Sequence, residues 1–214
     1  MESKWKKYRH CLYLLYIPVY AVWFILLEKH VTENYWVSYV PFDDKIPFVP
    51  AFVVAYVLWY PYLFGTGLYA MARDAAAFRR YMAYTIGTLS TCLFICTIFP
   101  NGQNLRPDLT GRYDIFSRLI ALLYAADTNT NSLPSMHVVG SVGAMLGVFD
   151  LTRKKWLRAA SVVLCVLICA STVFIKQHSI LDTLAGFAVA AVFALPVYGR
   201  YFAKRKKEER LAAK

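Results

Sequence analysis

Six stretches of the chain are almost continuously apolar, with polar or charged clusters between them. Each stretch is close to the roughly 20 residues that a helix needs to cross the hydrocarbon core of a bilayer. The pattern therefore predicts an all-α integral membrane protein in which residues 1–214 form a single membrane domain, a six-transmembrane-helix bundle. The predicted spans are residues 11–27, 47–72, 81–99, 133–149, 159–175 and 179–199.

The longest connection between predicted spans runs from residue 100 to residue 132. Loops longer than about 12–15 residues are usually functional or disordered. Within this loop, residues 115–124 have the amphipathic pattern of a short helix lying in the membrane interface. We therefore expect loop 100–132 to contribute to a site, the alternative being a solvated connector with chance apolar positions.

Small residues mark two of the predicted spans. Gly140, Gly143 and Gly147 recur in the fourth span, and Gly186 lies among alanines in the sixth. Small side chains let membrane helices approach each other closely. We expect these positions to be helix contacts.

The composition agrees with a membrane protein, since 58% of the residues are hydrophobic and 17% are charged. Soluble domains have roughly 45–50% and about 25% of these classes. This excludes a disordered chain, a disulfide scaffold and a soluble nucleic-acid binder. The five cysteines all lie in or beside predicted spans, so we interpret them as packing residues and predict no disulfide.

The positions of the charges predict the orientation of the bundle. Six spans place both termini on one side of the membrane, and that side holds 18 of the 24 Lys and Arg residues. Such an excess indicates the cytoplasm, so the N and C termini are predicted to be cytoplasmic and the net charge of +11 to face anionic lipid. The basic residues of the other side are Lys29, Lys45, Arg106, Arg112, Arg118 and Lys176.

Two histidines lie at the outer ends of predicted spans. His137 closes the run Pro134-Ser135-Met136-His137 at the start of the fourth span. A proline is favourable in the first helical turn, and a helix start here presents the free N–H groups of Ser135, Met136 and His137. Such an end is a suitable anion site.

The second histidine, His178, precedes Asp182 by four residues at the start of the sixth span. Residues four apart on a helix are neighbours, so Asp182 can accept a hydrogen bond from one ring nitrogen and leave the other free to attack. Upstream, Arg106 is followed by Pro107 in the long outer loop, and the planar guanidinium matches phosphate oxygens. Together these three groups predict phosphate chemistry on the outer face.

These motifs resemble those of the type 2 phosphatidic acid phosphatase superfamily of membrane lipid phosphatases and phosphotransferases. The resemblance covers the six-span layout and residues 99–186. The second family motif, Pro-Ser-x-His, is intact at residues 134–137, and the third, Ser-Arg-x5-His-x3-Asp, is present as Ser171-Thr172, His178 and Asp182. The first, Lys-x6-Arg-Pro, keeps Arg106-Pro107 but has Phe99 in place of its lysine.

The resemblance implies a role for each of these residues. His178 would be the nucleophile that becomes a phosphohistidine, Asp182 would orient it, and His137 would protonate the departing lipid oxygen. Arg106, Ser135, Ser171 and Thr172 would lie around the phosphate. Because Phe99 and Thr172 replace two family cations, we hypothesise that Lys176 restores one charge and that Gln103 supplies neutral donors.

The function predicted from these residues is hydrolysis of phosphate or pyrophosphate monoesters of lipids at an extracytoplasmic site, which we expect in the plasma membrane. The substrate would be an anionic lipid phosphate, such as phosphatidic acid or a polyprenyl pyrophosphate, and no metal or other cofactor is predicted. One alternative is a phosphotransferase resembling inositol phosphorylceramide synthase, because Ser-Thr replaces Ser-Arg. Others are a zinc hydrolase using His137, His178 and Asp182, and a non-enzymatic lipid transporter or scaffold.

Overall fold

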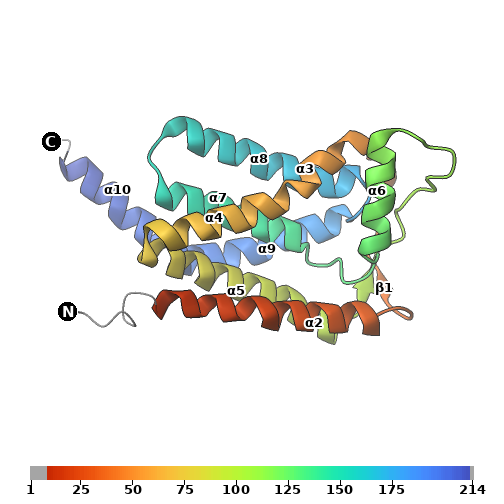
Figure 1. The fold of residues 1–214 in the computed structure, drawn as a ribbon, viewed down its shortest axis with the longest axis horizontal. Coiled ribbons are helices and arrows are strands. Elements are labelled where there is room, and N and C mark those ends of the chain that lie inside the picture. The colour runs from red at the N-terminus through yellow and green to blue at the C-terminus, as the bar shows by residue number, and fades with distance from the viewer. Residues whose placement is uncertain (1–8, 213–214) are drawn as a thin grey trace.

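A computed structural model describes residues 9–212 of the chain, and most of them are helical (Figure 1). Lys4, Lys6, Lys7 and Lys214, which belong to the predicted cytoplasmic charge, lie outside the described residues. The α-helices are α2 (Tyr16–His30), α3 (Val53–Val57), α4 (Trp59–Arg73), α5 (Ala75–Ile98), α6 (Ile115–Ala126), α7 (Met136–Leu151), α8 (Lys155–Phe174), α9 (Ile180–Ala194) and α10 (Arg200–Ala212). Short 3-10 helices cover Arg9–Leu15, Asp43–Lys45 and Pro50–Phe52, and a π-helical turn, Leu195–Gly199, joins α9 to α10.

Among the described residues, five helical segments are long and apolar enough to cross a membrane. They correspond to five of the six predicted spans, whereas α7, at the predicted fourth span, has 16 residues. A helix of that length extends about 24 Å, less than the ~30 Å hydrocarbon core. The five long segments are Arg9–His30, Pro50–Arg73, Ala75–Ile98, Lys155–Phe174 and Ile180–Arg205.

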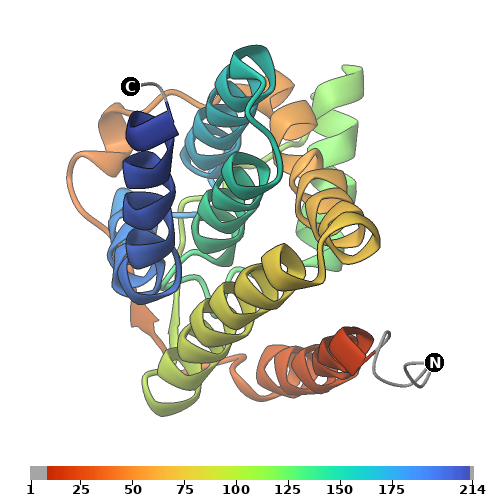
Figure 2. The same ribbon diagram turned by 90° about the vertical axis from the view of Figure 1, so that its left-hand side faces the viewer.

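Helix α7 occupies the centre of the bundle and packs on α4, α5, α8 and α9 (Figure 2). Its glycines make this close packing possible, as the sequence predicts. A Cβ on Gly143 would lie 2.5 Å from the Tyr84 ring, and one on Gly186 of α9 would lie 2.9 Å from the Ser135 carbonyl oxygen. These distances leave no room for a methyl group, so the small residues fix how closely the helices approach.

The predicted second span bends at Leu58, between α3 and α4. Pro61 explains the bend, because it has no amide to donate to the carbonyl of Val57 and its ring clashes with that carbonyl. On either side of Leu58, Tyr56 of α3 and Trp59 of α4 both contact His137 at the start of α7.

At one end of the bundle, the two connections that the sequence predicts to be outer join each other. Strand β1 (Trp36–Val37) pairs in parallel with β2 (Asn101–Gly102). Helix α6 lies across this end, roughly perpendicular to the bundle (Figure 1). A helix at residues 115–126 confirms the predicted short helix, although its position in a membrane interface stays a prediction. Helix α10 lies at the opposite end.

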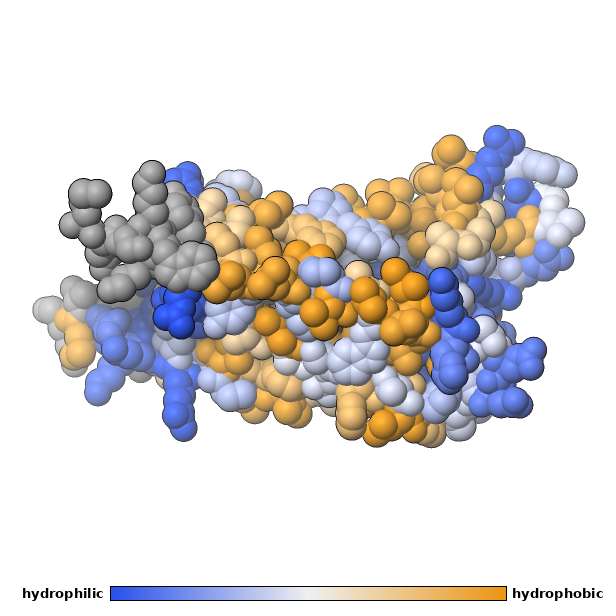
Figure 3. Space-filling model, turned by 60° about the horizontal axis from the view of Figure 1, so that its bottom comes forward, coloured by the Kyte–Doolittle hydropathy of each residue, from blue (hydrophilic) through white to orange (hydrophobic). Residues whose placement is uncertain are grey.

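The described surface has an apolar band between two polar ends (Figure 3). Large apolar side chains are also exposed on several of the long helices, for example Val19 and Val22 of α2, Leu68 of α4 and Val163 of α8. Because large exposed apolar surfaces are rare on soluble monomers, the band agrees with an integral membrane protein.

Candidate active site

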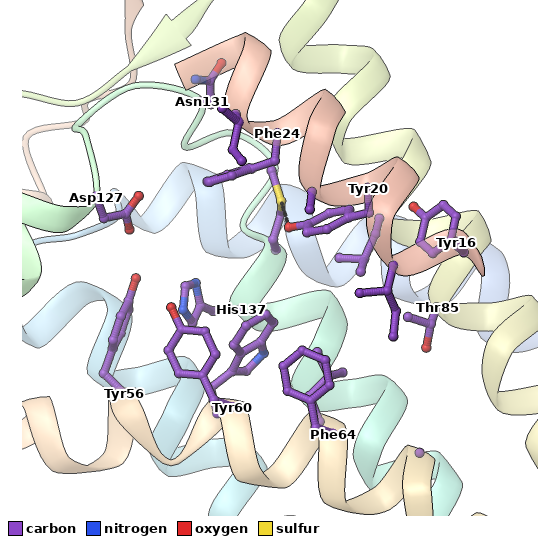
Figure 4. Close-up of a pocket in the computed structure, with 18 of the residues that line it drawn as sticks. Tyr16, Tyr20, Phe24, Tyr56, Tyr60, Phe64, Thr85, Asp127, Asn131 and His137 are labelled. Atoms are coloured by element: carbon purple, nitrogen blue, oxygen red, sulfur yellow. Dashed lines mark hydrogen bonds between the residues drawn. The ribbon is translucent and has the colours of Figure 1, made fainter. Parts of the chain in front are cut away.

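A cavity of about 460 Å³ runs between α2, α4, α5 and α7. Figure 4 shows its two ends: Tyr16 and Thr85 lie at one, and Asp127, Asn131 and His137 lie at the other. The walls between them are mainly aromatic and aliphatic, including Phe24, Phe64 and Leu89. The cavity therefore joins a polar end, near α6 and the outer loops, to a long apolar space.

His137 and His178 both line the polar end of this cavity. His137 is the second residue of α7, and His178 lies two residues before the start of α9. The centroids of their rings are 5.8 Å apart, and each side chain belongs to a residue that is less than 10% exposed. The structure thus brings together the two histidines that the sequence predicts to share a site.

Asp182 lies beside His178, as the spacing of four residues predicts. Its Oδ2 is 3.4 Å from Nδ1 of His178, although Nδ1 makes no hydrogen bond there. Oδ2 also accepts the Ser179 amide in a capping box, and Oδ1 accepts the Ser38 hydroxyl. These contacts hold the carboxylate on the Nδ1 side of the ring, opposite Nε2.

His137 has different surroundings. Its ring stacks on Tyr56 with centroids 4.1 Å apart and lies 4.5 Å from the ring of Trp59. Its Nε2 is buried and has no hydrogen-bond partner. These two rings hold the imidazole in place beside the ring of His178.

The start of α7 differs from the prediction in two respects. Pro134 does not occupy the first helical turn, because the helix begins at Met136 with Ser135 as its N-cap residue. The Ser135 amide is not free, because it donates to the carbonyl oxygen of Asp182 at 3.0 Å. The physical reason is that the first turn of α9 packs directly against this end. The amides of Met136 and His137 precede the first intrahelical bond, from Val139 to Ser135, and the Ser135 hydroxyl is buried without a partner.

Arg106 lies close to the histidines, but its donors are engaged by the protein. The guanidinium donates to the carbonyl oxygens of Tyr124, Asp127 and Thr128 and to the side-chain oxygen of Gln177. It also lies over the Tyr124 ring. Arg106 therefore braces the end of α6 against the residue next to His178.

The other predicted phosphate contacts do not line the cavity. Lys176 adopts a left-handed backbone, φ +57°, and its Nζ donates to the carbonyl oxygen of Asp43 at 2.7 Å. The hydroxyls of Ser171 and Thr172 donate to carbonyls one turn earlier in α8. Gln103 is fully buried, and its Nε2 has no partner.

Two acidic residues near the histidines are absent from the sequence prediction. The Asp43 carboxylate accepts from the Ser179 hydroxyl and the Ile180 amide, so it caps the start of α9. Asp127 follows the last residue of α6 and lines the cavity, where Figure 4 shows the Tyr56 hydroxyl pointing toward it. Burial raises the pKa of Asp127 to about 6. Both residues lie more than 45 positions from His178 in the sequence, so only the three-dimensional structure shows that they are near it.

Within residues 9–212, no group of three His, Cys, Asp or Glu side chains is arranged to hold a metal ion. His137, His178 and Asp182 lie near one another but do not converge on one point. The zinc alternative therefore gains no support from this arrangement.

Comparison with known proteins gives one match. The sequence profile of the PAP2 superfamily matches residues 82–206, which is more than half of the chain. The chain belongs to the PAP2 superfamily. The matched range contains Arg106, Pro134–His137 and His178–Asp182, and it begins before the loop that carries α6. No curated protein sequence and no solved structure matches the chain significantly. Membership confirms the family resemblance predicted from the sequence. It also supports phosphatase or phosphotransferase chemistry on lipid phosphates in general.

Proposed function

We propose that this member of the PAP2 superfamily transfers the phosphoryl group of a membrane lipid to His178, and that water then releases it. The protein would thus be a lipid phosphate phosphatase acting on phosphate or pyrophosphate monoesters. The observation that carries the proposal is the pairing of His178 and His137 at the polar end of an apolar cavity. A reacting phosphate and a lipid chain can then be bound side by side.

The reaction has two steps. Nε2 of His178 forms a bond to phosphorus while the bond from phosphorus to the lipid oxygen breaks, and His137 gives that oxygen a proton. Water then attacks phosphorus, the phosphorus–nitrogen bond breaks, and His137 takes a proton from the water. Asp182, held 3.4 Å from Nδ1, stabilises the cationic ring of the intermediate.

The cavity supports a lipid as substrate. The cavity, at about 460 Å³, is far larger than a site for a single water molecule. Its walls between Tyr16 and His137 are mainly apolar. Burial of a hydrocarbon chain there contributes about 0.8 kcal/mol per methylene relative to water, but much less relative to the bilayer. The main effect of the cavity would therefore be to orient a lipid, because leaving the bilayer for the cavity gains little free energy.

The test uses purified protein in detergent with a chelator present. Free phosphate is measured from phosphatidic acid and from a polyprenyl pyrophosphate, for wild type, His178→Ala and the control His30→Ala, whose side chain is exposed at the end of α2. We expect release by wild type and the control and none by His178→Ala. Equal release by His178→Ala contradicts the proposed nucleophile, and loss of wild-type release on chelation contradicts metal independence. Silence with every lipid favours the transporter or scaffold alternative.

One observation favours the phosphotransferase as a second candidate. Among the described residues that line the cavity there is no Lys or Arg, and Arg106 and Lys176 have partners in the protein. A phosphate monoester carries a charge of about −1.5 to −2 at neutral pH, whereas a phosphodiester carries a single negative charge. A site with few free cations therefore suits transfer of a phospho-headgroup from a diester to an alcohol acceptor.

A further inference from the structure

Asp127 is the one charged residue, other than the histidines, among the described residues that line the cavity. It lies at the polar end, where its side chain projects from the end of α6 toward Tyr56 (Figure 4). Gln177 places its side-chain N–H 3.4 Å from Oδ2 of Asp127. Because Gln177 is adjacent to His178 in sequence, the carboxylate belongs to the same small volume as the proposed nucleophile.

Among the Lys and Arg side chains that the structure describes, none forms an ion pair with the Asp127 carboxylate, although Arg106 is close. Arg106 bonds the backbone carbonyl of Asp127 instead of its side chain. Asp127 is half-buried, and a carboxylate withdrawn from water is costly without a cation unless it has another role. The structural role at the end of α6 is already filled by backbone groups and by Arg106.

The polar end of the cavity also holds buried polar atoms without partners. Asn131 and Ser132 are 5% and 4% exposed, and the Asn131 side-chain oxygen and the Ser132 hydroxyl make no hydrogen bond. Both residues line the cavity, as does His137 with its unpartnered Nε2. Such atoms are rare in folded proteins, and together they indicate that a polar ligand is bound here.

The charges around Asp127 limit which phosphate fits. Glu28 and Tyr56 face it from α2 and α3, and Arg106 and His178 face it from the loops. Burial raises the pKa of Asp127 to about 6, so most of the carboxylate is ionised at pH 7.5. The ionised carboxylate repels further negative charge and attracts a hydrogen-bond donor.

We infer that Asp127 recognises the headgroup of a phosphodiester lipid: its carboxylate accepts a hydrogen bond from an O–H or N–H of the alcohol esterified to phosphorus. This inference rests on the proposed phosphoryl transfer at His178 and develops its second candidate. The headgroup stays on phosphorus throughout the reaction, held by Asp127, while the other substituent changes.

The steps balance as follows for such a substrate. Nε2 of His178 bonds to phosphorus, the bond to the diacylglycerol oxygen breaks, and His137 protonates that oxygen. The hydroxyl of an acceptor alcohol or of water then bonds to phosphorus, the phosphorus–nitrogen bond breaks, and His137 takes the hydroxyl proton. Diacylglycerol is therefore a product whichever acceptor is used.

The test measures diacylglycerol by mass spectrometry in detergent micelles containing one lipid at a time, with identical acyl chains. Phosphatidylglycerol and phosphatidylinositol offer O–H donors, phosphatidylethanolamine offers N–H donors, and phosphatidylcholine offers none. We expect at least one donor-bearing lipid to react about tenfold or more faster than phosphatidylcholine, which is the loss typical of a missing hydrogen bond to a charged group. Preference for the first two lipids identifies a hydroxyl, and preference for the third identifies an ammonium group.

The variant Asp127→Asn should remove most of this preference, and the exposed control Asp108→Asn should keep it. Equal rates with phosphatidylcholine and the donor-bearing lipids in wild type overturn the inference, as does an unchanged preference in Asp127→Asn. If wild type converts only phosphatidic acid and His178→Ala converts none, the inference is overturned and the proposed phosphatase activity stands. Conversion of no lipid at all overturns both.

Discussion

His137 and His178 lie with their ring centroids 5.8 Å apart, but only His178 has a carboxylate beside it. His137 has aromatic rings on two sides instead, from Tyr56 and Trp59. A nucleophile must begin with a neutral attacking nitrogen, and an acid must begin protonated. The two histidines therefore lie in unlike surroundings, as two different roles in one reaction require.

Asp182→Asn should lower phosphoryl transfer on the order of 10²-fold or more, because the amide neither orients Nδ1 nor stabilises the cationic ring. The control is Ser179→Ala, which removes the other side chain of the capping box and costs about 1 kcal/mol of stability. Turnover of a lipid substrate and the thermal midpoint in detergent are measured for both. A similar loss of turnover in the two variants contradicts a direct role for Asp182.

Gly186→Ala should destabilise the protein by about 1–3 kcal/mol, because its Cβ would meet the Ser135 carbonyl and Val138 at 2.9 Å. The variant should also lose activity, since the collision lies between the two histidines' helices. Gly65→Ala is the matched control, with nothing within 4 Å of its added Cβ. A helical alanine there should be neutral or slightly stabilising. Equal thermal midpoints for the two variants contradict this packing.

Asp127→Asn should stabilise the protein at pH 7.5. The pKa of Asp127 is raised from 3.8 to about 6 by burial, so ionisation opposes folding once the pH rises through this interval. The gain over wild type should be on the order of 1–3 kcal/mol above pH 7 and should disappear as the pH falls to 4. Thermal midpoints measured from pH 4 to pH 8 give the result, and a gain that does not depend on pH contradicts the assignment.

Asp108→Asn is the control for this pH series. Hydrogen bonds from Thr110 lower the pKa of Asp108, which is opposite in direction to the shift at Asp127. The substitution should therefore give no gain in thermal midpoint at pH 7.5.

Lys176→Ala should be about 1 kcal/mol less stable than Lys176→Gly, because residue 176 has φ +57° and glycine adopts this conformation without strain. Both variants lose the amine that bonds the Asp43 carbonyl. Since the amine has this partner, we expect the KM for a lipid phosphate to stay within about twofold. A large rise in KM of equal size in both variants would instead support the phosphate-binding role that the sequence predicts for Lys176.

Arg106→Lys should lower stability by about 1–3 kcal/mol, because lysine cannot reproduce the planar fork that bonds three carbonyls and Gln177. Arg112→Lys, exposed in the same loop, is the control and should change little. Thermal midpoint and KM are compared in the two variants. A rise in KM without loss of stability would show that Arg106 binds phosphate and does not brace α6.

The helices and the two histidines are predictable from the sequence because their signals are local. Hydropathy marks the spans, and four residues separate His178 from Asp182 on one helix. Asp43 and Asp127 have no such signal, since each reaches the site only through contacts with distant segments. The helix start at residue 135 predicts a free Ser135 amide. In the structure this amide donates to the Asp182 carbonyl, a contact between distant segments that the sequence does not show.

The contact between the first turns of α7 and α9 also joins parts of the candidate site that are synthesised at different times. His137 and its aromatic neighbours enter the membrane first, and α9 follows last among the helices of the site. Ser38 and Asp43, made much earlier, gain their partners Asp182 and Ser179 only at that moment. A chain made only as far as α8 therefore lacks the proposed nucleophile and its carboxylate, and the proposed reaction has to wait for α9.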